Sequence, residues 1–278
     1  MNKTKFEGNI LIIGLGSITQ GTLPLLFRHF DISHKQVKII TADENRKEIA
    51  EKEFNIEVII NPLTKENYIE TLDKLVKKGD FIVNLSVDVS SKALANYCLE
   101  KEIFYTDTCT EYWAGGYTSK NKTTSERSNY WLRESFLELK GKGKTTCLMT
   151  HGANPGLVSH LTKKAILNIS KDISNEKEEE IQIPKTQKEW STLAKNLGIK
   201  VIHIAERDTQ ESKHLKKLGE FVNTWSVDGF ISEGLQPAEL GWGTHEKKLP
   251  KEGHEHDFGR KSSIYLERPG MNTRVRKF

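Results

Sequence analysis

The segment NILIIGLGSITQG, residues 9–21, decides the fold of this chain. A run of apolar residues leads into Gly14 and Gly16, and a helical pattern of apolar residues continues to residue 30. A buried strand, a tight glycine turn and a helix, in that order, bring backbone N–H groups and a helix N-terminus to a pyrophosphate. The segment therefore predicts a dinucleotide-binding βα unit whose phosphate contacts come from Gly14, Gly16, Ser17 and Ile18.

This glycine turn departs from the usual G-x-G-x-x-G pattern at its third glycine. Thr19 stands there instead, and Gly21 follows two positions later. Because the third glycine serves close packing between helix and strand, we expect looser packing here. Pro24 also removes one hydrogen bond from the helix.

Short apolar runs and amphipathic stretches alternate through the first half of the chain. The runs expected to form strands are residues 9–13, 37–41, 57–60, 81–85, 104–107 and 146–150. The stretches expected to form helices are residues 18–30, 45–54, 66–78, 90–100 and 125–139. Repeated βα order predicts an α/β fold, a Rossmann-type doubly wound parallel sheet, and we place this domain at residues 1–150.

Residues 151–278 have a weaker pattern, and we expect a partial α+β substrate domain there. HGANPGL, residues 151–157, predicts a turn entering a helix, with Asn154 as N-cap and Pro155 at the first helical position. Residues 171–180, rich in lysine and glutamate, predict a solvated loop or helix face. Strand-like runs such as residues 221–227 are followed by scattered glycines.

Composition excludes several classes of protein. The net charge of +4, from 42 basic and 38 acidic residues dispersed along the chain, does not indicate a nucleic-acid partner. No stretch approaches the roughly 20 apolar residues of a membrane span, and residues 1–8 lack a secretory h-region, so we expect a cytoplasmic protein. Three widely spaced cysteines predict reduced thiols. His245, His254 and His256 lie in a polar stretch without a rigid ligand pair, and no metal site is predicted.

The end of the second strand bears on the choice of dinucleotide. Asp43 lies where an acidic side chain accepts hydrogen bonds from an adenosine ribose, which favours NAD. Arg46 is close enough to leave NADP open. The alternative for Asp43 is a cap of the following helix, and we favour ribose binding.

Polar residues follow the fourth and fifth predicted strands. Because ligands bind beyond the carboxyl ends of parallel strands, we expect Asn84, Ser86 and Asp88 after the fourth strand to face the cofactor. We expect the same of residues 107–113 after the fifth strand, which include Thr110 and Glu111. The alternative for the two carboxylates is an ordinary loop or cap position.

Four longer segments carry a resemblance that covers essentially the whole chain. They are TDTCTEYWAGGY (106–117), AERDTQ (205–210), FVNTWSVDGFISEGLQPAELGWGTHE (221–246) and YLERPGMNTRVR (265–276). With the glycine turn and the PG-containing turn at residues 155–156, they resemble bacterial homospermidine synthases of the saccharopine dehydrogenase-like superfamily. That resemblance implies an NAD-dependent aminobutyl transferase, which condenses two putrescines into homospermidine with loss of ammonia and reoxidises its NADH within the cycle.

The resemblance also implies site roles. Asn154 lies near the nicotinamide and the reacting amine, Glu206 and Glu233 bind or deprotonate that amine, and Trp225 stabilises cationic intermediates. The residues suit this chemistry, because a dicationic diamine entering a pocket requires carboxylates such as Asp88, Glu111, Glu206 and Glu233 to offset lost hydration. A general base must act before hydride leaves, and Glu206 is our first choice. Trp113 and Trp242 are weaker aromatic candidates.

Family members are longer than this chain, and their additional part contributes an active-site histidine and further acidic residues. We therefore expect a homodimer or a separate C-terminal chain to complete the substrate domain. Three hypotheses remain open: a homospermidine synthase, a related NAD(P)-dependent imine reductase, and a nucleotide-binding remnant without activity. The acidic and aromatic lining, without an evident arginine cluster for a substrate carboxylate, separates the first hypothesis from the second, although Arg207, Arg268 and Arg274 keep the second open.

Overall fold

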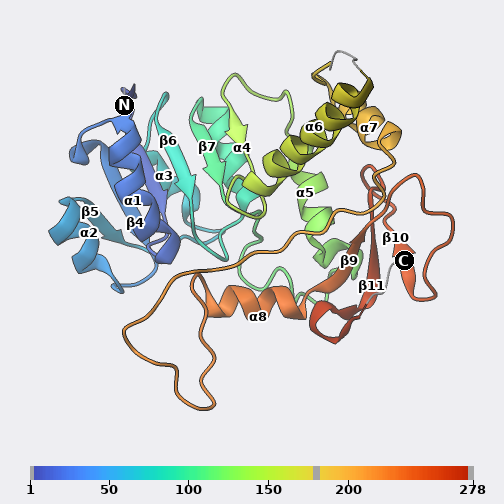
Figure 1. Ribbon diagram of the computed structural model, residues 1–278. Coiled ribbons are helices and arrows are strands. Elements are labelled where there is room, and N and C mark those ends of the chain that lie inside the picture. Colours follow the sequence, from blue (N-terminus) through green and yellow to red (C-terminus); the bar gives the residue numbers. More distant parts are fainter. Residues whose placement is uncertain (1–2, 178–181, 275–278) are drawn as a thin grey trace.

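The computed structural model describes residues 3–177 and 182–274, and its first half is built on a six-stranded parallel sheet (Figure 1). The strands lie in the order β5 (Glu57–Ile60), β4 (Val37–Thr41), β2 (Ile10–Ile13), β6 (Phe81–Asn84), β7 (Phe104–Asp107) and β8 (Cys147–Leu148). The first strand of the βα series, β2, is therefore central, with the second and third on one side and the later ones on the other. This is the Rossmann order, and it confirms the predicted fold.

Both faces of this sheet are covered by helices. These are α1 (Ser17–His29), α2 (Lys47–Phe54), α3 (Tyr68–Leu75), α4 (Ser91–Lys101) and α5 (Asn129–Leu137). Side chains alternate along β2, so Ile10 and Ile12 join one apolar cluster with Leu23 of α1, while Leu11 joins another with Leu94 of α4. A strand buried on both faces explains the uninterrupted apolar run ILII. The predicted helix over 125–139 is split into a short 3-10 turn, Ser125–Arg127, and α5.

Thr19 closes the glycine turn instead of loosening it. Its side chain is fully buried, and its Oγ1 donates to the carbonyl oxygen of Gly14 at 2.8 Å. The expectation of looser packing between α1 and β2 is therefore wrong, because the hydroxyl satisfies a backbone acceptor at the place where a third glycine would leave space. Pro24 lies inside α1, as expected.

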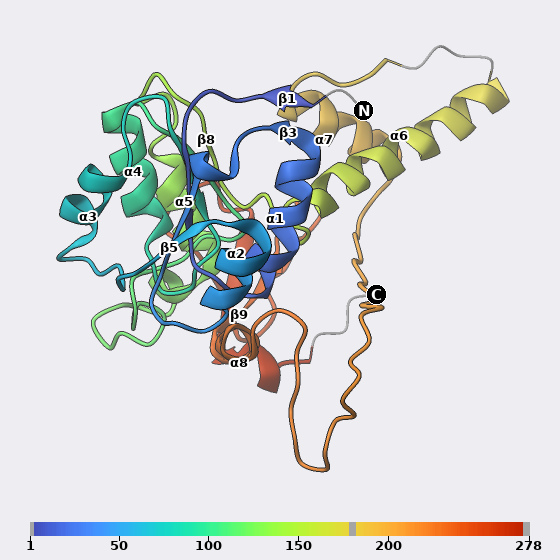
Figure 2. The ribbon, with the colours of Figure 1, turned by 90° about the vertical axis from the view of Figure 1, so that its left-hand side faces the viewer.

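The second half of the chain has helices and a small antiparallel sheet, which confirms the α+β prediction. The helices are α6 (Leu157–Lys177), α7 (Gln187–Asn196) and α8 (Val227–Leu235), and the strands lie in the order β10 (Gly253–Glu255), β11 (Ser263–Pro269), β9 (Pro237–Gly241). The shorter elements are β1 (Thr4–Lys5) with β3 (Phe30–Asp31), and the 3-10 turns His34–Gln36 and Gly270–Asn272. Residues 199–226 contain no helix or strand; this long connection crosses the molecule in Figure 1 and runs down one side in Figure 2.

Three local predictions for this half have clear outcomes. Residues 171–177 belong to α6, and exposure of residues 171–175, with Ser174 partly buried, confirms a solvated helix face; residues 178–180 lie outside the described residues. The strand expected over 221–227 is wrong: Ser226 caps α8 by accepting from the Gly229 N–H, so the helix begins at Val227. His256 is buried rather than in a polar loop, with Nδ1 2.8 Å from Ser125 Oγ.

The predicted cap at Asn154 is also wrong. Helix α6 begins at Leu157, whose N–H bonds to the carbonyl oxygen of Gly152 at 2.9 Å. Asn154 and Pro155, joined by a cis peptide bond, lie in a turn closed by the Gly152 N–H and the Pro155 carbonyl oxygen. Gly156, at φ +135°, then redirects the chain into the helix.

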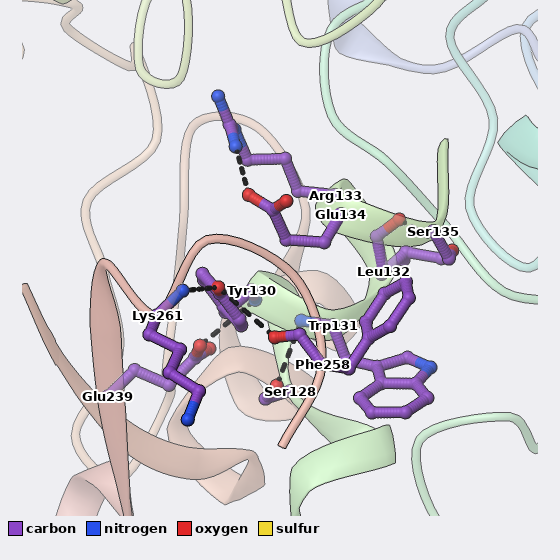
Figure 3. Close-up of polar contacts among 10 residues, drawn as sticks. All are labelled: Ser128, Tyr130, Trp131, Leu132, Arg133, Glu134, Ser135, Glu239, Phe258 and Lys261. Atoms are coloured by element: carbon purple, nitrogen blue, oxygen red, sulfur yellow. Dashed lines mark hydrogen bonds and ion pairs between the residues drawn. The ribbon is translucent and has the colours of Figure 1, made fainter. Parts of the chain in front are cut away.

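Helix α5 is the platform on which the antiparallel sheet docks (Figure 3). The Glu239 carboxylate on β9 accepts from the backbone N–H groups of Asn129 and Tyr130 at 2.8 and 2.9 Å. The Tyr130 hydroxyl accepts from the Lys261 N–H at 2.6 Å and donates to the Phe258 carbonyl oxygen at 3.3 Å. One carboxylate from the second half therefore satisfies the first N–H groups of a helix in the first half.

No helix among the described residues has the length and apolarity needed to cross a bilayer. The cysteines Cys98, Cys109 and Cys147 are all unpaired, as expected.

Candidate functional site

The candidate site lies at the carboxyl edge of the parallel sheet, where β2 and β6 are neighbours and the strand order reverses. Gly14 has φ +95°, and a Cβ added to it would lie 3.0 Å from backbone atoms of Leu85 and Ser86. The turns after β2 and β6 are therefore in direct contact, and only glycine fits at residue 14.

Gly16 faces open space, which suits a phosphate group. Among the described residues nothing lies within 4 Å of the position of an added Cβ, and no side chain caps α1, whose N-cap is Gly16. The first N–H groups of a helix lack intrahelical acceptors and carry a partial positive charge. The start of α1 at Gly16 is therefore open and has the partial charge that suits an anion, and the predicted contacts Ser17 and Ile18 follow it in the first turn.

Asn84 is buried and shapes the neighbouring turn. Its Oδ1 accepts from the hydroxyl and the N–H of Ser86 at 2.6 and 3.2 Å, and its Nδ2 donates to the Tyr105 hydroxyl at 3.4 Å. The Tyr105 hydroxyl in turn donates to Asp107 Oδ2 at 2.8 Å. This chain of hydrogen bonds runs along the edge of the sheet from β6 to β7.

Asp107 connects that chain to the turn that contains Asn154. Its Oδ1 accepts from the Thr150 N–H at 2.5 Å, and its carbonyl oxygen accepts from the His151 N–H at 2.8 Å. Burial raises the pKa of Asp107, while its hydrogen bonds, including those from Thr150 and Tyr105, oppose the rise. The exposed Asn154 is thereby brought to the same edge of the sheet as the glycine turn.

Asp43 lies in the exposed segment after β4, beside the glycine turn. The Gly14 N–H bonds to the carbonyl oxygen of Ile40 on the same strand at 2.8 Å. Asp43 Oδ1 accepts from the Asn45 N–H at 2.8 Å, and Arg46, at φ 64°, occupies the N-cap position of α2. Asp43 therefore closes a turn ahead of the helix and does not cap it.

Four carboxylates that are far apart in the sequence are linked in pairs by electrostatic repulsion, Asp88 and Glu233 with Glu111 and Glu206 with Glu233. Burial raises the pKa of Glu111 to about 7, and repulsion from Asp88 and Glu233 adds to the rise. Desolvation raises the pKa of Glu233 on α8, and repulsion from Glu206 adds to it. The turn after β6, the turn after β7, the long connection and α8 therefore converge, and Figure 1 shows α8 lying along the lower side of the molecule in that view.

The aromatic candidates have different surroundings. Trp225 is 39% exposed directly before α8, and its ring covers Gly229, where an added Cβ would be 2.7 Å from it. Trp113 packs against Tyr68 with ring centroids 5.3 Å apart, next to the apolar core, which indicates a packing role. Trp242 lies just after β9, and its backbone N–H donates to the Ser262 carbonyl oxygen at 2.8 Å.

Sequence reasoning missed the residues that surround Glu111. Thr110, predicted to face the cofactor, is buried, and its carbonyl oxygen accepts from the Tyr117 hydroxyl at 3.1 Å. Cys109 and Ser91 also contact Glu111. No spacing in the sequence signals these contacts, because an irregular loop and the first turn of α4 form them together. Within residues 3–177 and 182–274, no three His, Cys, Asp or Glu side chains are grouped to hold a metal ion.

Family comparison agrees with this architecture. Residues 10–148 match the model described as the saccharopine dehydrogenase NADP binding domain. The chain belongs to the saccharopine dehydrogenase family. Residues 152–277 match a second model of that family, described as the saccharopine dehydrogenase C-terminal domain.

Within the saccharopine dehydrogenase family, the chain is similar to homospermidine synthases. It is 45% identical over 280 residues to the homospermidine synthase of Mesorhizobium japonicum and 44% identical over 279 residues to that of Blastochloris viridis. Each alignment covers 99% of this chain but 57% of the relative, so the chain spans little more than half their length. The crystal structure of the Legionella pneumophila homospermidine synthase in complex with NAD superposes with a TM-score of 0.81 at 42% identity, over 96% of this chain and 55% of that one.

Proposed function

We propose that this chain acts in polyamine biosynthesis as a homospermidine synthase, an NAD-dependent aminobutyl transferase that condenses two putrescines into homospermidine and releases ammonia. The convergence of Asp88, Glu111, Glu206 and Glu233 beside an open glycine turn is the observation that carries the proposal. Identity of 44–45% to curated homospermidine synthases supports it.

NAD is the proposed cofactor, and the structure offers residues that fit it. The open N-terminus of α1 suits a pyrophosphate, and exposed Asp43 suits a ribose hydroxyl. The remaining proposed contacts are Gly14, Gly16, Ser17, Ile18, Asn84, Ser86, Thr110 and Asn154. When bound there, NAD would supply reversible hydride transfer at the amine-bearing carbon. The matching family model is described for NADP and the Legionella structure contains NAD; Asp43 favours NAD, whereas Arg46 would suit a 2′-phosphate.

The carboxylates would bind the diamine. Putrescine is dicationic at neutral pH, and its ammonium groups lose hydration on binding unless anions replace the water. Glu206 and Glu233 would hold one amine, with half-buried Glu111 and exposed Asp88 nearer the sheet edge. Trp225, exposed beside α8, would stabilise a cationic intermediate by about 0.5–2 kcal/mol through its ring face.

The same electrostatics disfavour the imine reductase alternative. An amino-acid substrate would bring a carboxylate among four acidic side chains, and like charges repel. Arg268, one of the arginines that kept this alternative open, forms an ion pair with Glu252. The lining therefore favours a diamine over an amino acid.

A turnover assay tests the proposal. Purified chain with putrescine and a catalytic amount of NAD should form homospermidine and ammonia without accumulating NADH. Stoichiometric NADH would instead indicate a dehydrogenase, and NAD binding without either reaction would indicate a nucleotide-binding remnant. The homodimer or separate C-terminal chain and the cytoplasmic location stay predictions; size-exclusion chromatography tests the first.

Two variants separate the proposed roles. Gly16→Val places a branched side chain at the open start of α1 and should abolish NAD binding, measured by calorimetry. Trp225→Ala should lower turnover much more than NAD affinity, because the ring is assigned to the intermediate. Equal losses in both measurements for both variants would contradict this division.

A further inference from the structure

Glu111 is held by a frame of contacts from helix α4 and from its own loop. Its N–H donates to Ser91 Oγ at 2.9 Å, and the Ser91 N–H donates to the Glu111 carbonyl oxygen at 3.1 Å. The Ser91 hydroxyl donates to the Cys109 carbonyl oxygen at 3.4 Å. Because Ser91 is fully buried in the first turn of α4, the backbone of residues 109–111 is anchored to a rigid element.

Two neutral donors surround the Glu111 carboxyl. The Cys109 thiol donates to Glu111 Oε1 with an Sγ···O distance of 3.4 Å. The Tyr117 hydroxyl, bonded to the Thr110 carbonyl oxygen at 3.1 Å, lies within hydrogen-bonding reach of the Glu111 side chain and lowers the pKa of Glu111. Burial raises the pKa of both Cys109 and Tyr117, so both keep their protons at neutral pH.

The surroundings of Glu206 differ from those of Glu111. Glu206 is exposed in the long connection, whereas Glu111 is half-buried among donors and near two other carboxylates. A carboxyl that exchanges a proton in each cycle needs donors for its anionic form and an apolar setting for its neutral form. Glu111 has both.

We infer that Glu111 carries the proton of the substrate amine and that Tyr117 and Cys109 are positioning residues that orient its carboxyl; this inference rests on the proposed function. A proton leaves the substrate ammonium nitrogen for Glu111 Oε, which leaves the amine with a lone pair and the carboxyl neutral. The same proton later returns to the departing ammonia. When Glu111 is ionised, the Tyr117 O–H donates to its carboxylate. When Glu111 is protonated, the Tyr117 O–H turns to the Thr110 carbonyl oxygen.

This arrangement predicts how the protonation of Glu111 responds to its neighbours. Hydrogen bonds from Cys109 and Tyr117 lower the pKa of Glu111, against the burial that raises it to about 7. Removing the Tyr117 donor should raise the midpoint of the Glu111 titration by about 0.5–1 pH unit, which is the value of one net hydrogen bond. Cys109→Ala should raise it by less, since a thiol is a weak donor, and Cys109→Ser should restore it.

The test is a carbon-13 NMR titration of the glutamate side chains, with Glu111 assigned through Glu111→Gln. The matched control is Tyr112→Phe, because Tyr112 is in the same loop but its hydroxyl donates to the Glu126 carbonyl oxygen at 2.6 Å. The inference is supported if the Glu111 titration midpoint rises in Tyr117→Phe and in Cys109→Ala but not in Tyr112→Phe or in Cys109→Ser. Unchanged midpoints in both positioning variants, or an equal move in Tyr112→Phe, overturn it.

A second readout separates this inference from the proposed function. The acid limb of the pH profile of kcat/KM for homospermidine formation should move upward with the NMR midpoint in the same variants. An acid limb that stays in place while the midpoint moves overturns the assignment of Glu111 as proton carrier. If the wild-type chain forms no homospermidine at any pH although Glu111 titrates as described, the proposed function fails instead.

Discussion

Glu239→Ala should loosen the docking of the antiparallel sheet on α5. The carboxylate accepts from the first two N–H groups of that helix at 2.8 and 2.9 Å, while Ser128 Oγ accepts from the Trp131 N–H at 3.1 Å (Figure 3). Loss of a helix cap costs about 0.5–2 kcal/mol, and loss of a carboxylate near a helix N-terminus costs about 0.3–1 kcal/mol. Burial raises the pKa of Glu239 against the hydrogen bonds from the Tyr130 and Asn129 N–H groups, so desolvation reduces what the charge contributes. We expect a net loss of about 1–2 kcal/mol.

Amide hydrogen exchange measures this loss at the bond itself. A loss of 1.4 kcal/mol corresponds to about tenfold faster opening, so the Tyr130 N–H should exchange about 5 to 30 times faster in Glu239→Ala than in the wild type. The urea midpoint should fall in parallel. Glu267→Ala is the matched control, because that carboxylate accepts from Thr124 Oγ1 in an exposed contact and caps no helix. Unchanged exchange at Tyr130 in Glu239→Ala would refute the reasoning.

The remaining predictions concern the sheet edge. Gly14→Ala, at φ +95° and 3.0 Å from backbone atoms, should cost about 1–3 kcal/mol in urea unfolding, whereas Gly16→Ala in open space should cost much less; equal losses would contradict the geometry. Because burial raises the pKa of Glu111 to about 7, its protonated form favours folding below about pH 4.5 and this contribution is lost as the pH rises to about 7. As the pH rises from 4.5 to 7.5, the free energy of unfolding of Glu111→Gln should therefore increase by about 2–3 kcal/mol relative to that of the wild type. A difference that stays constant with pH would argue against it. Asp107→Asn leaves one acceptor oxygen fewer for the Thr150 N–H and the Tyr105 hydroxyl. It should lower the free energy of unfolding by about 1–3 kcal/mol and weaken NAD binding at the same edge of the sheet. Wild-type values in both measurements would exclude the proposed structural role of Asp107.

Much of the first half could be predicted from local patterns. Uninterrupted apolar runs, separated by amphipathic stretches, identify parallel strands because such strands are buried on both faces. Gly14 follows a strand and precedes a helix, and only a glycine fits the observed contact with Ser86. Predictions that concerned a single turn were less secure: Thr19 replaces a glycine with a hydroxyl that bonds to Gly14, and Ser226 starts a helix where a strand was expected.

The candidate site, too, could be predicted from the sequence only in part. The sequence by itself determined which strand ends carry Asp88 and Glu111, because the carboxyl ends of parallel strands share one edge of the sheet. Only the tertiary structure brought Glu206 and Glu233 to that edge and placed Cys109, Ser91 and Tyr117 around Glu111. The physical reason is that periodicity reports burial and local hydrogen bonding, whereas contacts made through irregular loops depend on the whole path of the chain.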